Sequence, residues 1–127
     1  MVWAFEDEID PFAEAVADCL PESRAVVPML WRLEVGNALL VGKRRKRISE
    51  AKVTQFLGLL EAFPIEVDDQ TVTKAWSESL NLARSHNLSV YDACYLELAL
   101  RRGLPIASLD VPLKAAAAKI GVEVFKP

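Results

Sequence analysis

Three acidic side chains stand at points of the chain from which they could reach one common site: Glu34, Asp92 and Asp110. Glu34 lies inside an apolar helical run, Asp92 lies near the start of another predicted helix, and Asp110 ends a short apolar segment with strand character. Carboxylates gathered in one place repel one another unless a cation lies between them, and oxygen ligands suit a hard dication. The pattern therefore indicates a divalent metal site and phosphate chemistry.

Glu34 is the most informative of the three because its helical neighbours are Leu30, Asn37 and Ala38. An ionised carboxylate on such a face costs several kcal/mol unless it is paired or bound to a metal. Asn37, one turn further along, could orient the carboxylate or bind a coordinated water. The alternative is a partly exposed glutamate that pairs with a cation from elsewhere in the chain.

Asp92 and Asp110 each have a purely structural alternative. Ser89 and Asp92 fit a capping box, with the acid three residues after the N-cap. Asp110 could be the N-cap of the helix that follows it. Ser108, two residues before Asp110, points to the same face of the strand and could assist with its hydroxyl group. For both acids, capping and metal binding remain open.

An unbroken basic run follows the helix that carries Glu34. Its members are Lys43, Arg44, Arg45, Lys46 and Arg47. Cations complement the negative end of a helix dipole, so the run could simply mark a solvated turn. The other interpretation is that it grips substrate phosphates or a partner. The net charge of −3 argues against nucleic-acid binding through overall charge.

Length and composition predict one domain over residues 1–127. The hydrophobic content of 52% and mean hydropathy of +0.17 exclude a disordered chain and favour self-association. We expect no membrane span, because charges interrupt every apolar stretch, and no basic leader, because the start is acidic. Cys19 and Cys94 are interpreted as reduced, buried thiols, which suits a cytoplasmic protein.

Apolar periodicity predicts helices alternating with short strands. We expect helices over 11–20, 29–41, from 49 to about 60, 71–85, 90–102 and 113–120, and strands over 25–27, 64–68, 105–109 and 122–125. This order predicts an α/β fold with a parallel sheet between helices. Ligands of such sheets bind outside the carboxyl ends of the strands, which is where the three acids belong.

Several residues carry more specific structural predictions. Ser49 is a natural N-cap, and Gly103 is placed to end the helix before it. The tryptophans Trp3, Trp31 and Trp76 stand at helical spacing among apolar residues and are assigned to the core. The inner side of the 71–85 helix is expected to carry Val72, Ala75, Trp76, Leu80 and Ala83. Asp68 and Asp69 are interpreted as solvated loop charges.

Three segments, 26–39, 88–99 and 105–110, together resemble a PIN domain. They contain an E-x-x-N-A-L helix, a Y-D-A-x-Y-L helix and an S-L-D strand end, in that order. The closest resemblance is to the VapC-type toxins of bacterial toxin–antitoxin pairs, and it covers nearly the whole chain.

The resemblance implies a parallel sheet sandwiched by helices and a Mg²⁺- or Mn²⁺-dependent endoribonuclease. It implies that Glu34, Asp92 and Asp110 hold the metal, and that Ser108 is the small hydroxyl residue often found before the last acid. A metal-activated water would hydrolyse RNA at phosphorus. The implied partners are RNA, a cognate antitoxin and a second copy of the chain.

One departure from the family pattern concerns the N-terminus. Family members begin with an apolar strand that ends in an Asp, before a helix that resembles residues 2–8 here. We therefore expect this chain to lack the first strand and the first catalytic Asp, with Glu6, Asp7 and Glu8 not replacing it. The gap would be compensated by rearrangement, by dimer contacts, or by residues 1–5 moving into it.

Two further functions compete with the nuclease. The first is a catalytically impaired PIN-like module that binds an antitoxin-like partner through its apolar surface, which the missing Asp favours. The second is a phospho-receiver-like domain. It is disfavoured because no suitably placed lysine follows the strand-end acid.

Overall fold

The computed structural model describes residues 1–5 and 11–127. Its strands are β1 (Val2–Trp3), β2 (Val26–Pro28), β3 (Glu66–Asp68) and β4 (Ile106–Ala107). Its helices are α1 (Pro11–Cys19), α2 (Trp31–Arg44), α3 (Glu50–Glu61), α4 (Thr71–Lys74), α5 (Leu80–His86), α6 (Val90–Arg102) and α7 (Val111–Lys119), with a π-helical turn η1 (Ala75–Ser79) between α4 and α5.

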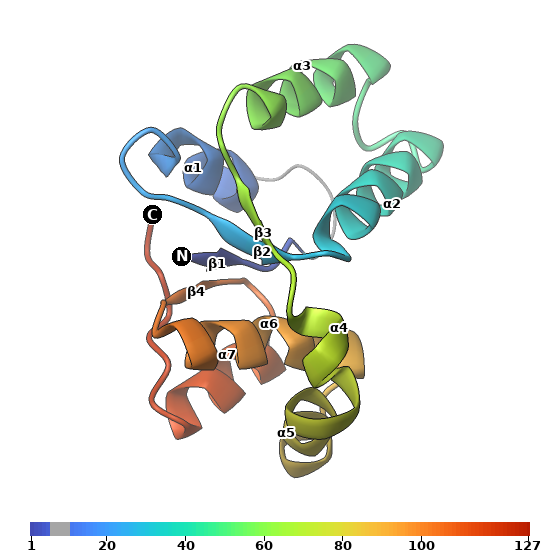
Figure 1. Ribbon diagram of the computed structural model, residues 1–127. Coiled ribbons are helices and arrows are strands. Elements are labelled where there is room, and N and C mark those ends of the chain that lie inside the picture. The colour runs from blue at the N-terminus through green and yellow to red at the C-terminus, as the bar shows by residue number, and fades with distance from the viewer. Residues whose placement is uncertain (6–10) are drawn as a thin grey trace.

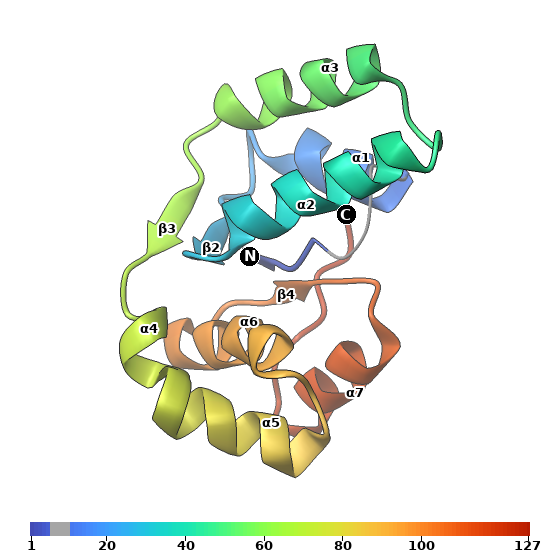
Figure 2. The ribbon, with the colours of Figure 1, turned by 90° about the vertical axis from the view of Figure 1, so that its right-hand side faces the viewer.

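The strands form one parallel sheet in the order β3-β2-β1-β4. Helices α1, α2 and α3 cover one face, and α4 to α7 cover the other (Figure 1). The same two layers are visible after a quarter turn (Figure 2). The predicted α/β class, a parallel sheet sandwiched by helices, is confirmed.

The prediction that residues 2–8 continue a helix is wrong for the described part of that segment. Val2–Trp3 is instead a central strand of the sheet. The Val2 N–H donates to Pro105 O at 2.8 Å, and Met1 O accepts from the Val26 N–H at 2.8 Å. Of the three expected compensations, residues 1–5 filling the gap is what the structure shows. All five are buried, and without them β2 and β4 would expose unpaired backbone. Glu6, Asp7 and Glu8 lie outside the described residues.

Aromatic side chains join β1 to the helices above it. The ring centroids of Trp3 and Trp31 lie 5.6 Å apart, and those of Phe5 and Phe56 lie 5.9 Å apart. Such tilted pairs add a modest stabilisation to the burial of their area. Trp3 and Trp31 are thus core residues, as predicted, and they fix α2 and its acid against the sheet.

The assignment of Trp76 and Val72 to the core is wrong, since Trp76 is 92% exposed and Val72 is also exposed. Residues 75–79 form a π-helical turn, which has more residues per turn than an α-helix. The smaller rotation per residue displaces the apolar stripe that α-helical spacing predicts. Ser79 and Ala83 are buried on the inner side instead.

Most predicted helix ends are confirmed. Ser49 Oγ accepts a hydrogen bond from the Lys52 N–H at 3.1 Å, and Gly103 ends α6 in the left-handed region at φ 64°. The expected strand over 122–125 is only a single bridge between Ile106 and Val124. Since β4 is two residues long, it offers little backbone to pair.

The prediction that both cysteines are buried is confirmed for Cys94 and wrong for Cys19. Cys94 is buried and Cys19 is partly exposed, and both are free thiols. Within the described part of the chain, every helix is too short or too polar to cross a bilayer.

Candidate active site

Glu34 lies in the first turn of α2, directly after β2 ends. Its side chain is half-buried, and the hydroxyl of Tyr95 on α6 donates a hydrogen bond to Oε1. Burial raises the pKa of the Glu34 carboxyl, the bond from Tyr95 lowers it, and the charge of Asp92 raises it. The fold therefore holds this carboxylate in an environment that disfavours its charge.

Asp92 lies in the first turn of α6, where Ser89 is the N-cap. The Asp92 N–H donates to Ser89 Oγ at 3.0 Å, which is one of the two hydrogen bonds of the predicted capping box. Burial raises the pKa of Asp92, and the charge of Asp110 raises it further, while hydrogen bonding with the Ser89 side chain lowers it. Asp92 thus lies in a capped first turn and is affected by another carboxylate.

Asp110 is the N-cap of α7. Its Oδ2 accepts a hydrogen bond from the Leu113 N–H at 2.9 Å. Its own N–H donates to Oγ of the buried Ser108 at 3.0 Å. The capping role is confirmed, and one carboxylate oxygen, Oδ1, is not engaged by that cap.

The three acids interact in a chain with Asp92 in the middle. The charge of Asp92 raises the pKa of Glu34, and the charge of Asp110 raises the pKa of Asp92. They lie at the carboxyl edge of the sheet, after β2, at the start of α6 and after β4. Among residues 1–5 and 11–127, no three acidic, histidine or cysteine side chains gather closely enough to hold a metal ion. The three-carboxylate metal site therefore stays a prediction.

The donor set nevertheless fits a hard dication in its chemistry. The pKa values of the partly buried Glu34 and Asp92 are each raised by burial and by one neighbouring carboxylate, so a cation beside them would be favourable. Carboxylate oxygens are also the ligands that Mg²⁺ prefers. The arrangement supports such an ion between neighbouring acids.

The remaining predicted residues lie further out. Asn37 is exposed on α2, one turn after Glu34. The basic run 43–47 is exposed where α2 ends, and Lys43 pairs with Glu50 at 3.2 Å. Since a helix rises 1.5 Å per residue, Lys43 begins about 13 Å along α2 from Glu34. The basic run therefore lies away from the three acids, at the other end of α2.

Comparison with known proteins identifies the family. The family model for the PIN domain matches residues 1–119. This chain belongs to the PIN-domain family. PIN domains are generally nucleases that act on RNA, usually with divalent metals, and they are often related to toxin–antitoxin pairs.

The fold of this PIN domain is similar to a solved structure, that of PAE2754 from Pyrobaculum aerophilum. The TM-score is 0.66 at 24% sequence identity, over 91% of this chain and 82% of the other. No curated protein matches the chain. At that identity the structural likeness concerns the fold alone.

Sequence reasoning missed the role of Tyr95 in this PIN domain. Tyr95 is 2% exposed and holds Glu34 across the sheet edge. A signal was present, because Tyr95 stands three residues after Asp92 and so shares its helical face. The pairing with Glu34, 61 residues away, could not be read from that spacing.

The interpretation of Asp68 as a solvated loop charge is wrong. Asp68 is 5% exposed at the end of β3, and Arg101 binds both of its oxygens, at 3.0 and 2.8 Å. Arg101 also binds Glu97 on its own helix, with Nε 2.8 Å from Oε2. This second acidic pair is neutralised by a guanidinium group, so it differs from the uncompensated acids at the site.

Proposed function

We propose that this PIN domain, as one domain over residues 1–127, is a metal-dependent endoribonuclease of a VapC-type toxin–antitoxin pair. The observation that carries the proposal is the half-buried chain of acids, in which the pKa values of Glu34 and Asp92 are raised by burial and by a neighbouring charge. Functional sites commonly hold such uncompensated charge, because a bound cation or substrate completes them.

In this proposal Asp92 would hold Mg²⁺ or Mn²⁺ together with Glu34 and Asp110. The ion would activate water and neutralise charge on the attacked phosphate. Tyr95 fixes the orientation of Glu34 through its hydroxyl group, and Ser108 fixes the backbone of Asp110. Asn37 would position solvent beside Glu34.

The substrate and partners follow from the surface of α2. The exposed run Lys43, Arg44, Arg45, Lys46 and Arg47 would contact RNA phosphates at a distance from the cleaved bond. The cognate antitoxin and a second copy of the chain would cover exposed apolar side chains. The free thiols of Cys19 and Cys94 suit action in the cytoplasm.

A second candidate is a catalytically impaired interaction module. The apolar side chains on α2 favour it, since Leu33 is 78% exposed and Leu40 is 44% exposed on the same face. Isolated apolar residues on a surface are ordinary, but a row along one helix suits the helix or tail of a protein partner. This function needs no metal.

The deciding experiment is RNA cleavage by the full chain with added Mg²⁺ or Mn²⁺. The Asp92→Asn variant should lose at least about 100-fold in rate, because it removes a proposed ligand but keeps the size of the side chain. The control is Asp69→Asn, the same substitution at an exposed loop position. Equal cleavage by the Asp92→Asn variant would reject this site.

Thermal unfolding provides a second measurement that does not depend on turnover. Mg²⁺ should raise the Tm of the parent protein, because a ligand bound only to the folded state stabilises it. The Asp92→Asn variant should show a higher Tm without metal and a smaller response to Mg²⁺. Metal-independent Tm values together with no cleavage would favour the interaction module.

A further inference from the structure

A pocket of about 520 Å³ opens at the edge of the sheet opposite the acids. It lies where the strands begin, since Ala25 precedes β2, Ile65 precedes β3 and Pro105 precedes β4. Helix α6 connects the two edges, with Asp92 in its first turn and Arg102 at its end. Ten residues of helix separate these two positions by about 15 Å. The pocket is therefore distinct from the acidic site.

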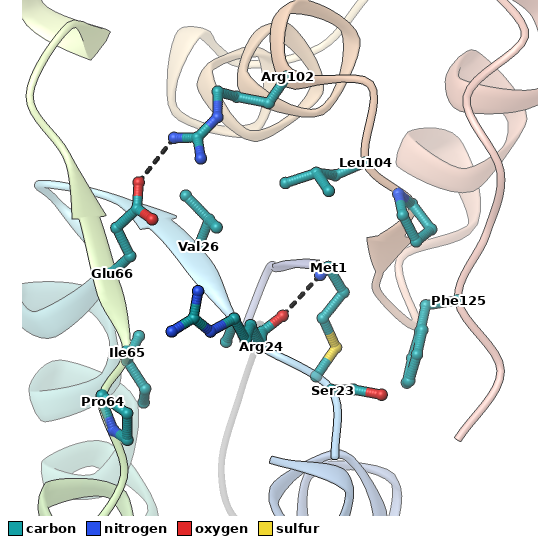
Figure 3. A pocket seen from close by; sticks show the side chains of 12 residues that line it. Met1, Ser23, Arg24, Val26, Pro64, Ile65, Glu66, Arg102, Leu104 and Phe125 are labelled. Carbon is teal, nitrogen blue, oxygen red and sulfur yellow. Dashed lines mark hydrogen bonds and ion pairs between the residues drawn. The ribbon is translucent and has the colours of Figure 1, made fainter. Parts of the chain in front are cut away.

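Two guanidinium groups enter the pocket from different elements (Figure 3). Arg102 comes from the end of α6 and Arg24 from the segment before β2. They face a single carboxylate, Glu66, which binds Arg102 at 2.7 Å. Arg102, and to a smaller extent Arg24, lowers the pKa of Glu66, so both cations act within the same space.

The two arginines of this pocket outnumber its one carboxylate, in contrast to the whole chain, whose net charge is −3. The amino group of Met1 also lies there and donates to Arg24 O at 2.7 Å (Figure 3). The guanidinium of Arg24, by contrast, extends along the exposed side of the pocket toward Glu66. The polar part of a ligand for this pocket is therefore an anion.

The rest of the lining is apolar and partly aromatic. Phe125 and Leu104 stand on one side, and Pro64 and Ile65 stand on the other (Figure 3). The volume far exceeds that of an inorganic anion and falls within the range of pockets that hold small organic ligands, roughly 300–1,000 Å³. An aromatic ring beside cations suits a planar base joined to a phosphate.

We propose that this pocket binds a nucleoside monophosphate. Arg24 and Arg102 hold the phosphate in place of Glu66, and the base lies between Phe125 and the opposite apolar wall. Binding here requires neither a divalent metal nor the acids at the other edge. It therefore goes beyond the proposed nuclease and does not depend on it.

The test is calorimetric titration of the full chain with adenosine monophosphate in EDTA, which removes metal binding at the acidic edge. We expect saturable one-site binding that the Arg24→Gln variant weakens at least about tenfold. The matched control is Arg84→Gln, the same change at an exposed position on α5, which should bind like the parent. Adenosine and inorganic phosphate should each bind at least about tenfold more weakly than the nucleotide.

A second variant should change the nucleotide affinity in the opposite direction. Glu66→Gln removes the carboxylate that competes for Arg102, so the nucleotide should bind several-fold more tightly. Glu66 is exposed, so this change should leave the fold intact. Weaker binding by the Glu66→Gln variant, or no saturation below about 10 mM, would overturn the proposal.

Two other outcomes would also overturn it. Equal affinity for inorganic phosphate would show a simple anion site without base recognition. Loss of binding in the Asp92→Asn variant, with no effect of Arg24→Gln, would place the nucleotide at the acidic edge. Loss of RNA cleavage alone would reject the nuclease and leave the pocket proposal standing.

Discussion

Replacing Arg101 with leucine should destabilise this domain more than any neighbouring surface change. Arg101 binds both oxygens of Asp68 and, through Nε at 2.8 Å, the Glu97 carboxylate. The side chains of Asp68 and Glu97 are each 5% exposed, and that of Arg101 is 21% exposed. Arg101→Leu would keep much of the packing volume and remove the guanidinium group that binds both buried carboxylates, leaving Asp68 with only the more distant Arg102, at 4.0 Å.

The magnitude follows from this burial. Removing one partner of a buried ion pair costs about 3–5 kcal/mol, because the remaining charge stays desolvated. Water can reach Arg101 from its exposed side, so we expect the lower end, about 3 kcal/mol. The matched control is Arg102→Leu. Arg102 pairs mainly with the exposed Glu66, at 2.7 Å, and its contact with Asp68 Oδ1 is longer, at 4.0 Å, so its loss should cost about 1 kcal/mol.

Urea unfolding measures the difference directly. With m-values of about 1–3 kcal/mol/M, the Arg101→Leu midpoint should fall by about 1–3 M and that of Arg102→Leu by less than about 1 M. Adding Asp68→Asn and Glu97→Gln to Arg101→Leu should recover at least half of the loss, because the cost lies in unpaired charge. Two arginine variants within 1 kcal/mol of each other, or no recovery, would refute the reasoning.

Three further predictions concern single groups. Arg101 holds the pKa of Asp68 below its usual value of 3.8, so this ion pair stabilises the fold fully above pH 3.8 and is lost as the pH falls through the lower pKa of the folded state. The Tm of the Asp68→Asn variant should therefore fall less in acid than that of the parent, and parallel curves of Tm against pH would contradict this. Tyr95→Phe should raise the pKa of Glu34 further, as measured by carbon NMR of its carboxyl, and lower the unfolding free energy by about 1 kcal/mol. An unchanged or lower pKa would show that the hydrogen bond does not favour the ionised form. Lys46 adopts the left-handed φ of 57°, which glycine tolerates better, so Lys46→Gly should raise the unfolding free energy by about 0.5–1 kcal/mol. A lower unfolding free energy of this variant in urea would argue against backbone strain at Lys46.

Local chemistry let the sequence predict much of the fold. Ser49, Ser89 and Asp110 each cap a helix through a backbone N–H three residues away, and Gly103 supplies the left-handed residue that ends α6. Each of these interactions closes within a few residues, so the sequence alone contains both partners. Apolar periodicity likewise predicted alternating helices and strands, and with them a parallel sheet between two helical layers.

The sequence also placed the three acids at one edge of that sheet. Parallel strands have their carboxyl ends on the same side of the sheet. Glu34, which follows β2, and Asp110, which follows β4, therefore had to lie at the same edge. Topology alone does not fix how side chains turn within that edge. The structure decided that the charge of Asp110 acts on Asp92, and that Tyr95 holds Glu34.

Only the tertiary structure decided the outcomes that depend on distant partners. Val2–Trp3 became a central strand because the edges of β2 and β4 required pairing, although the family pattern predicted a helix there. Asp68 became a buried ion-pair partner because Arg101, 33 residues later, reaches it across the fold. Such contacts lose chain entropy and gain burial only when both segments are in place, so no window of sequence contains them.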